Sequence, residues 1–215
     1  MLAIAGGKGG VGKTTTTLAL AATLGNERRP VRVVDVDCDM PDLHTLAGCD
    51  REPTLAAVRD GGPLADQEVR SYPGVRLVGA PARSGCAGAG RFDVVAALRT
   101  LDDGDRLTTL VDTPGGAGPP AVDPLRAAEA TVLVSDSTQQ SLLDAAKTAA
   151  MARQLDTRVV GVVLTRTQAA PSGVADLLDT PVLATVPSAR RPLNSTAVWS
   201  AYDTAAQRLS TQTII

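Results

Sequence analysis

Short apolar segments alternate with longer segments of helical periodicity along the whole chain, and this alternation constrains the fold most strongly. The apolar segments are rich in β-branched residues, and several are apolar at consecutive positions, as strands buried on both faces of a sheet are. The expected strands are residues 2–5, 31–36, 75–78, 107–111, 131–134, 159–164 and 182–186. The expected helices are residues 14–24, 92–101, 139–155, 174–178 and 198–209. This order predicts an α/β fold of three layers, in which a mostly parallel sheet carries helices on both faces.

The composition is that of an ordinary globular protein. The 215 residues are 44% hydrophobic and 20% charged, and 21 basic against 23 acidic side chains give a net charge of −2. Such a balance excludes a disordered chain and a generally basic nucleic-acid binder. We expect a single domain over residues 1–215, because one core suffices at this length and no repeat or long linker interrupts the alternation. The Gly- and Ala-rich stretch 81–90 is expected to be a surface loop.

The sequence predicts a cytoplasmic protein. The apolar N-terminal segment ends at Gly6 after only a few residues, and no basic residues precede it. A signal peptide needs a basic region and a longer apolar region, so this segment argues against one. No apolar run approaches the roughly 20 residues of a transmembrane helix. Cys38, Cys49 and Cys86 are odd in number and lack C-x-x-C spacing, which argues against a disulfide scaffold or a zinc ribbon and suits a reducing compartment.

The segment after the first expected strand has the pattern of a phosphate-binding loop. Residues 7–14 satisfy G-x-x-x-x-G-K-[ST] and lie between an expected strand and an expected helix. A glycine-rich turn that matched the motif by chance would not require this strand and helix around it. Its glycines let backbone N–H groups approach phosphate oxygens, and the helix adds its positive N-terminal end. Lys13 is expected to bind the β- and γ-phosphates and Thr14 to bind Mg²⁺. A dinucleotide-binding loop, the alternative, would carry G-x-G-x-x-G without the Lys-Thr pair. The expected nucleotide contacts here are Gly7, Lys8, Gly9, Gly10, Val11, Gly12, Lys13, Thr14 and Thr15.

A second lysine makes this loop more specific. Lys8 gives the pattern K-G-G-x-G-K-T, in a chain that has only three lysines. With this pattern the chain resembles the deviant Walker A ATPases of the MinD/ParA family. The resemblance implies an ATP- and Mg²⁺-dependent homodimer, in which Lys8 reaches the nucleotide of the partner subunit and both Lys8 and Lys13 are catalytic. A charge delivered by the partner would stabilise the transferring phosphoryl group, as an arginine finger does.

Acidic residues follow two other expected strands. Asp35, Asp37 and Asp39 alternate at the end of the second strand, where like charges are costly unless a cation or water lies nearby; a solvated strand end before a proline turn is the structural alternative. Asp112 ends the strand before a Pro-Gly-Gly turn. The resemblance implies that Asp37 orients the attacking water and contacts Mg²⁺ through water, and that Asp112 holds a Mg²⁺-bound water. His44, the only histidine, is expected to be a loop residue without a catalytic role.

The resemblance also implies where the base would bind. GTPases of the same superfamily place an acid that reads guanine in the segment that here reads Thr165-Arg166-Thr167-Gln168, so ATP is favoured over GTP. Thr165 stands where the family usually has asparagine, and its hydroxyl matches adenine less well. Thr165 and Arg166, together with Pro187 and Ser188 after the last expected strand, are the expected base-side contacts.

These features predict an Mg²⁺-ATP-dependent, dimerising ATPase whose nucleotide state governs positioning or recruitment of an unidentified protein partner. Two alternatives stay open: an ATPase that assembles an iron–sulfur or other metal cargo, and a nucleotide-binding scaffold that does not hydrolyse ATP. The last expected helix has an apolar stripe but only one basic residue, Arg208, so it should pack on the sheet rather than bind a membrane directly. A partner would recruit the protein to a pole or membrane. Arg190-Arg191 is the only C-terminal basic pair, and DNA binding is not indicated.

Overall fold

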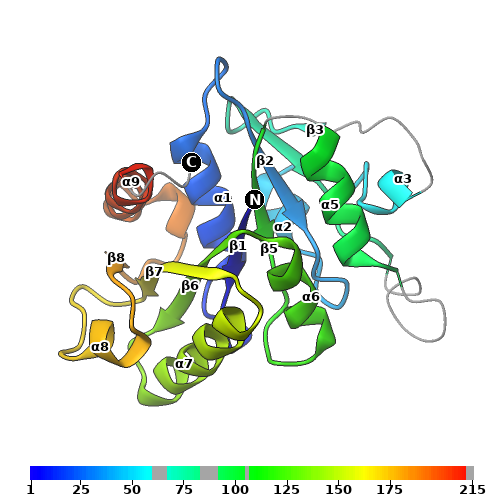
Figure 1. Cartoon of the computed structure of the whole chain (residues 1–215). Helices are drawn as coiled ribbons and strands as arrows, with labels where there is room; N and C mark the ends of the chain where they lie inside the picture. The colour runs from blue at the N-terminus through cyan, green and yellow to red at the C-terminus, as the bar shows by residue number, and fades with distance from the viewer. Residues whose placement is uncertain (60–66, 83–91, 105–106, 212–215) are drawn as a thin grey trace.

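The computed structural model describes residues 1–59, 67–82, 92–104 and 107–211. It contains every strand and helix that the sequence predicts, with bounds that differ by a few residues, together with several further elements (Figure 1). The strands are β1 (Leu2–Ala5), β2 (Val31–Asp35), β3 (Gln67–Glu68), β4 (Val75–Val78), β5 (Thr108–Asp112), β6 (Ala130–Asp136), β7 (Arg158–Thr165) and β8 (Val182–Val186). The helices are α1 (Lys13–Leu24), α2 (Leu43–Ala47), α3 (Ala56–Arg59), α5 (Val94–Gly104), α6 (Pro119–Ala127), α7 (Gln139–Gln154), α8 (Val174–Leu178) and α9 (Thr196–Ser210), with the 3₁₀ turn η1 (Pro192–Asn194).

The strands form one sheet in the order β3-β4-β2-β5-β1-β6-β7-β8. Every neighbouring pair is parallel except β3 and β4, which are antiparallel. This arrangement confirms the predicted mostly parallel sheet. Because β1 lies at the centre, between β5 and β6, the loop that follows it opens at the middle of the carboxyl edge, where parallel sheets bind ligands.

Alternating side chains of the central strand β1 enter cores on opposite faces of the sheet. In β1, Leu2 and Ile4 belong to the core that α1, α2 and α9 cover, whereas Ala3 and Ala5 face the core beneath α6 and α7. Both sets are at most 2% exposed. Figure 1 shows α1 and α9 on one side of the sheet and α5, α6 and α7 on the other. The predicted three-layer architecture is therefore confirmed.

Several short elements were not predicted. Helix α6 begins with Pro119 and Pro120 directly after Gly118, and the Gly- and Pro-rich sequence before it indicates a turn rather than a helix. Proline is nevertheless favourable at a first helical position, because its missing N–H has no partner there anyway. Helix α3 and strand β3, with four and two residues, are too short for a periodic pattern, and helix α2 lies in a segment that was expected to be a loop. Most of the stretch 81–90, expected to be a surface loop, lies outside the described residues.

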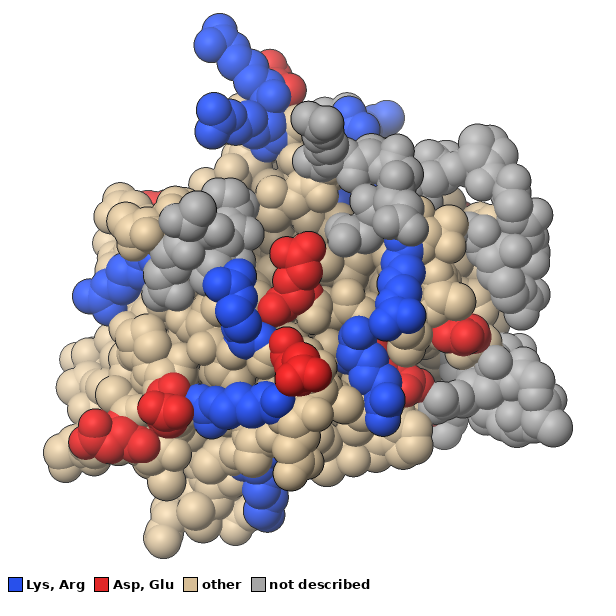
Figure 2. All heavy atoms as spheres, in the orientation of Figure 1, with Lys and Arg blue, Asp and Glu red and all other residues tan. Residues whose placement is uncertain are grey.

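Helix α9 packs as the sequence predicts. Its apolar stripe is buried against α1 and β8, and consists of Val198, Tyr202, Ala205, Ala206 and Leu209. None of the described helices is long and apolar enough to cross a membrane. Figure 2 shows basic and acidic side chains interspersed on the visible face of the molecule.

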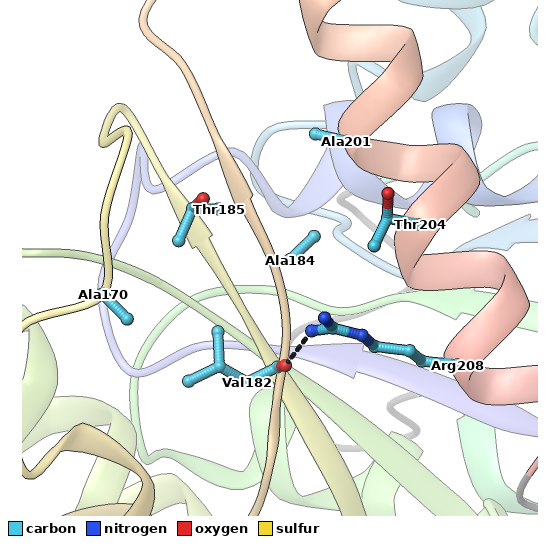
Figure 3. Close-up of a pocket in the computed structure, with 7 residues that line it drawn as sticks. All are labelled: Ala170, Val182, Ala184, Thr185, Ala201, Thr204 and Arg208. Atoms are coloured by element: carbon cyan, nitrogen blue, oxygen red, sulfur yellow. Dashed lines mark hydrogen bonds between the residues drawn. The ribbon is translucent and has the colours of Figure 1, made fainter.

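Arg208 of α9 covers part of the sheet edge at β8. Its Nη1 donates to the carbonyl oxygens of Val182 (2.7 Å) and Leu183 (3.0 Å), and Figure 3 shows the side chain crossing from α9 to the strand. A groove of about 360 Å³ lies beside this contact. It is lined by Ala170, Val182, Ala184, Thr185, Ala201, Thr204 and Arg208. A charged side chain that hydrogen-bonds to the backbone of a strand at the end of the sheet discourages pairing of that strand with another chain.

Candidate nucleotide-binding site

The glycine-rich loop joins β1 to α1 with an open outer side. Gly10 and Gly12 have φ of 75° and 96°, in the left-handed region that favours glycine, and Gly12 is the N-cap of α1. A Cβ added to Gly9 or Gly10 would meet no atom within 4 Å, so the loop backbone there faces open space. A loop that ends on a helix N-terminus with accessible backbone is suited to bind phosphate.

Lys13 lies at the base of this loop and is only 7% exposed. Its Nζ donates to the carbonyl oxygen of Lys8 at 3.4 Å. Burial lowers the pKa of Lys13, and the negative charges of Asp112, Asp37 and Asp42 act in the opposite direction. A phosphate group beside Lys13 would add a further negative charge and stabilise the ammonium form.

Two buried carboxyl groups lie side by side at the strand ends, and one of them, Asp112, acts on Lys13. Asp35 and Asp112 are register partners at the ends of β2 and β5, and each is 1% exposed. Burial, together with the charge of Asp112, raises the pKa of Asp35 to about 8. Burial also raises the pKa of Asp112 to about 7, against the lowering effects of the Thr14 hydroxyl, the Lys13 charge and the Thr17 hydroxyl. Such a pair favours a cation, because a positive charge nearby would stabilise both ionised forms.

The loop after β2 holds Asp37 through its own backbone. Asp37 Oδ1 accepts hydrogen bonds from the N–H groups of Asp39 (3.1 Å) and Met40 (3.0 Å). The Asp37 N–H in turn donates to Asp35 Oδ1 at 2.9 Å. The loop is therefore folded back on the strand end, with the charge of Asp37 still felt by Lys13.

The cysteines and the histidine near this loop depart from the sequence-based expectations. Cys38 is disulfide-bonded, whereas Cys49 is a free thiol, so the expectation of reduced cysteines is wrong for Cys38. The prediction that His44 lies in a loop is also wrong, because His44 belongs to helix α2. Its Nε2 lies 3.3 Å from the hydroxyl oxygen of Thr45.

Lys8 is exposed on the loop, and its charge acts on carboxylates of β6 and α7. Its positive charge contributes to the lowered pKa of Asp136, where the largest lowering effect is the hydrogen bond from Thr138. It also contributes to the lowered pKa of Asp144, where hydrogen bonds from Gln140 and Lys147 have the larger effect. Lys8 thus lies near both carboxylates while its side chain remains accessible to solvent.

The expected base-side residues follow β7 and β8, the two strands at this end of the sheet. Thr165 is 6% exposed, and its hydroxyl donates to the carbonyl oxygens of Val11 (2.7 Å) and Ser135 (3.3 Å). Arg166 has φ of 56° and donates from Nη2 to the carbonyl oxygen of Gly10 at 2.6 Å. Both side chains therefore connect β7 to the glycine-rich loop. Pro187 and Ser188 directly follow β8, at the same edge of the sheet.

Two residues near the site were not predicted from the sequence. The charge of Asp42 reaches Lys13 and Asp112. Thr17 donates from Oγ1 to Asp112 Oδ1 at 3.2 Å. The spacing of Thr17, four residues after Lys13 on an expected helix, could have placed both on one face; Asp42, in an irregular loop, gave no such signal.

The chemistry of these groups fits a magnesium nucleotide. An open glycine-rich backbone and a buried lysine suit the phosphates. The Thr14 hydroxyl and the carboxyl groups that end β5 and follow β2 are oxygen ligands of the kind that Mg²⁺ takes, directly or through water. The strand, loop and helix around Lys13 and the acidic ends of β2 and β5 define a P-loop nucleotide-binding domain.

Comparison with known proteins specifies the family. The family model described as the CobQ/CobB/MinD/ParA nucleotide binding domain matches residues 2–191, and the chain belongs to this family. The resemblance to MinD/ParA-type P-loop ATPases is thereby confirmed.

Individual proteins agree with this assignment. The antiactivator FleN of Pseudomonas aeruginosa is 34% identical over 151 residues, which cover 67% of this chain and 53% of FleN. An iron–sulfur cluster carrier protein of Methanococcus maripaludis is 29% identical over 168 residues, 75% of this chain and 58% of the carrier. This chain thus spans little more than half the length of these two relatives. The structure of the septum site-determining protein MinD of Pyrococcus horikoshii, complexed with Mg-ADP, has a TM-score of 0.84 at 22% identity and covers 99% of this chain and 96% of MinD, which shows the shared fold.

Proposed function

We propose that residues 1–215 form a single ATPase domain that binds Mg²⁺-ATP, dimerises with ATP and recruits a protein partner according to its nucleotide state. The observation that carries this proposal is the placement of one lysine inside the site and a second on its exposed rim. Lys13 is 7% exposed beside Asp112, whereas Lys8 of the same loop is exposed to solvent. A buried lysine serves a nucleotide on its own chain, while an exposed one is free to reach a nucleotide on another.

The residues of the site divide the chemistry between binding and hydrolysis. Lys13 and the loop backbone would bind the phosphates, and Thr14, Asp112 and Asp37 would hold Mg²⁺ directly or through water. When bound, Mg²⁺ neutralises the charge that develops on the phosphates. Asp37 would orient the attacking water, which requires its carboxylate to leave the backbone N–H groups of Asp39 and Met40 or to use its other oxygen. Lys8 would act on the nucleotide of the partner subunit.

The base side of the proposed site uses Thr165, Arg166, Pro187 and Ser188. The hydroxyl proton of Thr165 is engaged by Val11, so this side chain would offer a base only its acceptor lone pair. Selection of ATP over GTP would then be modest and would depend on backbone groups of the loops after β7 and β8.

We also propose that the protein works in the cytoplasm and reaches a pole or membrane through its partner. The buried stripe of α9 supports this view, because no apolar face of that helix is left for a membrane. The antiactivator FleN, a relative by sequence, is in keeping with action on another protein. Assembly of an iron–sulfur cargo is a second candidate, supported by the similarity to the carrier of Methanococcus maripaludis. A chelatable cluster in anaerobically purified protein would favour that candidate.

Gel filtration with ATP or ADP, combined with single-turnover hydrolysis, tests the proposal. The wild-type protein should dimerise with ATP only and should hydrolyse it. Lys8→Ala should bind ATP but remain monomeric and inactive, and Asp37→Ala should accumulate as an ATP-bound dimer with little turnover. Lys147→Ala is the matched control, because this remaining lysine is 71% exposed and pairs with Asp144 on α7. A Lys8→Ala protein that dimerises and hydrolyses normally would refute the proposed role of Lys8, and wild-type binding without hydrolysis would indicate a scaffold.

A further inference from the structure

Four consecutive threonines, residues 14–17, follow Lys13 at the start of helix α1, and the last two are fully buried. Thr14 ends the glycine-rich loop pattern, and Thr15 is the last of the expected nucleotide contacts there. Thr16 and Thr17 lie beyond it, and each is 0% exposed. A buried hydroxyl needs a hydrogen-bond partner, so the partners of these two side chains indicate what each does.

Thr17 contacts the carboxyl group at the end of β5. Its Oγ1 donates to Asp112 Oδ1 at 3.2 Å and lies 3.0 Å from the carbonyl oxygen of Lys13, so its single proton is shared between two acceptors. Lys13 and Thr17 are four residues apart on α1 and therefore occupy the same face of the helix. Thr17 thus connects helix α1 to the acidic end of β5.

Thr16 points to a different neighbour. Its Oγ1 lies 2.9 Å from the hydroxyl oxygen of Tyr202, a residue of α9 that is 1% exposed. Two adjacent threonines of equal burial thus make one hydrogen bond each to another element. Only the one made by Thr17 involves a residue of the nucleotide site.

We propose that Thr17 is a positioning residue, which holds the Asp112 carboxylate in the orientation required to bind the magnesium of a magnesium nucleotide. The inference rests on the proposed function. A carboxylate at a strand end can rotate about its terminal bond, and a donor fixed on a rigid helix restricts that rotation. Residues that hydrogen-bond to a metal ligand, without binding the metal themselves, typically change metal affinity by about ten-fold or more when they are removed.

Binding of a fluorescent ADP analogue (N-methylanthraniloyl-ADP) tests this inference without relying on hydrolysis. The affinity is measured first in EDTA and then as a function of Mg²⁺ concentration, for wild type, Thr17→Val, Thr17→Ser and Thr16→Val. Thr17→Val retains the side-chain shape without the hydroxyl, and Thr17→Ser restores the hydroxyl. Thr16→Val is the matched control, because it removes an equally buried hydroxyl that faces α9 instead of Asp112.

Thr17→Val should need about ten-fold more Mg²⁺ for half-maximal binding, while its affinity in EDTA stays close to that of wild type. Thr17→Ser should return to within about three-fold of wild type, since the donor is restored. Thr16→Val should melt at a lower temperature but keep the wild-type dependence on Mg²⁺. If Thr17→Val does not fold, Thr17→Ala gives the same comparison in a residue of high helix propensity.

Two failures can be told apart. A wild-type protein whose nucleotide binding does not respond to Mg²⁺ would refute the proposed function. A wild-type response that Thr17→Val or Thr17→Ala shares unchanged would overturn the role of Thr17 alone. Equal loss of affinity with and without Mg²⁺ would also overturn it, because it would mean that Thr17 supports the helix rather than the metal-binding carboxylate.

Discussion

Asp35→Asn should stabilise the nucleotide-free protein, and the gain should increase with pH. The native pKa of Asp35 is raised from 3.8 to about 8, chiefly by burial and then by the charge of Asp112. Between these two values the native state keeps a proton that the unfolded state has lost. The free energy of unfolding therefore falls as the pH rises from about 4 to about 8, and the loss is complete above the native pKa. Below pH 4 both states are protonated and there is no loss.

The size of the effect follows from that pKa difference. Each pKa unit corresponds to about 1.4 kcal/mol, so ionisation of Asp35 costs the native state about 4 kcal/mol at pH 7 and on the order of 5 kcal/mol above pH 8. Asparagine carries no charge and avoids this cost. Its side-chain oxygen can still accept from the N–H of Asp37. In the wild type the N–H of Leu43 donates to Asp35 Oδ2 at 3.4 Å, and asparagine would place its NH₂ group, a donor, at that position. Losing that acceptor costs about 1–3 kcal/mol at every pH.

Urea unfolding in EDTA without nucleotide, at pH 5, 7 and 8.5, measures the difference between Asp35→Asn and wild type. The variant should be close to wild type or slightly less stable at pH 5, and more stable by roughly 2–4 kcal/mol at pH 8.5. Asp203→Asn, which changes an exposed carboxylate on α9, is the control and should follow wild type throughout. A difference between Asp35→Asn and wild type that is constant from pH 5 to 8.5 would refute the reasoning, because it would mean that Asp35 ionises alike in both states.

Three further substitutions test other parts of the structure. Lys13→Ala should abolish tight ATP binding in calorimetry, because the phosphates lose the buried lysine of their own chain; unchanged affinity would contradict the phosphate-loop assignment. Tyr202→Phe should lower the free energy of unfolding by about 1–2 kcal/mol, because the Thr16 hydroxyl loses its partner at 2.9 Å; chemical denaturation at wild-type midpoint would show that this bond is dispensable. Arg208→Ala should increase aggregation on heating, followed by light scattering, because two carbonyls of β8 lose their donor; a variant that scatters no more than wild type would argue against protection of this edge.

Much of the fold could be predicted because its signals are local. Buried parallel strands such as β1 and β7 are apolar on both faces, so their composition identifies them without knowledge of their neighbours. The motif over residues 7–14 likewise identifies a phosphate-binding loop before a helix from residue type and spacing alone. Helix α6 was missed, because the prolines that start it are read locally as a turn and only their place at the helix N-terminus makes them favourable.

The sequence by itself determined which residue types the site contains, whereas the tertiary structure decided how they act on one another. The aspartates at the ends of the second and fifth strands are visible in the sequence, but only the strand order places Asp35 beside Asp112 and buries both. The same holds for Thr17, which reads as one more helical threonine until β5 brings Asp112 within 3.2 Å of its hydroxyl. The burial of these side chains and their hydrogen-bond partners depend on contacts between segments far apart in the chain. A pattern of neighbouring residues in the sequence does not contain that information.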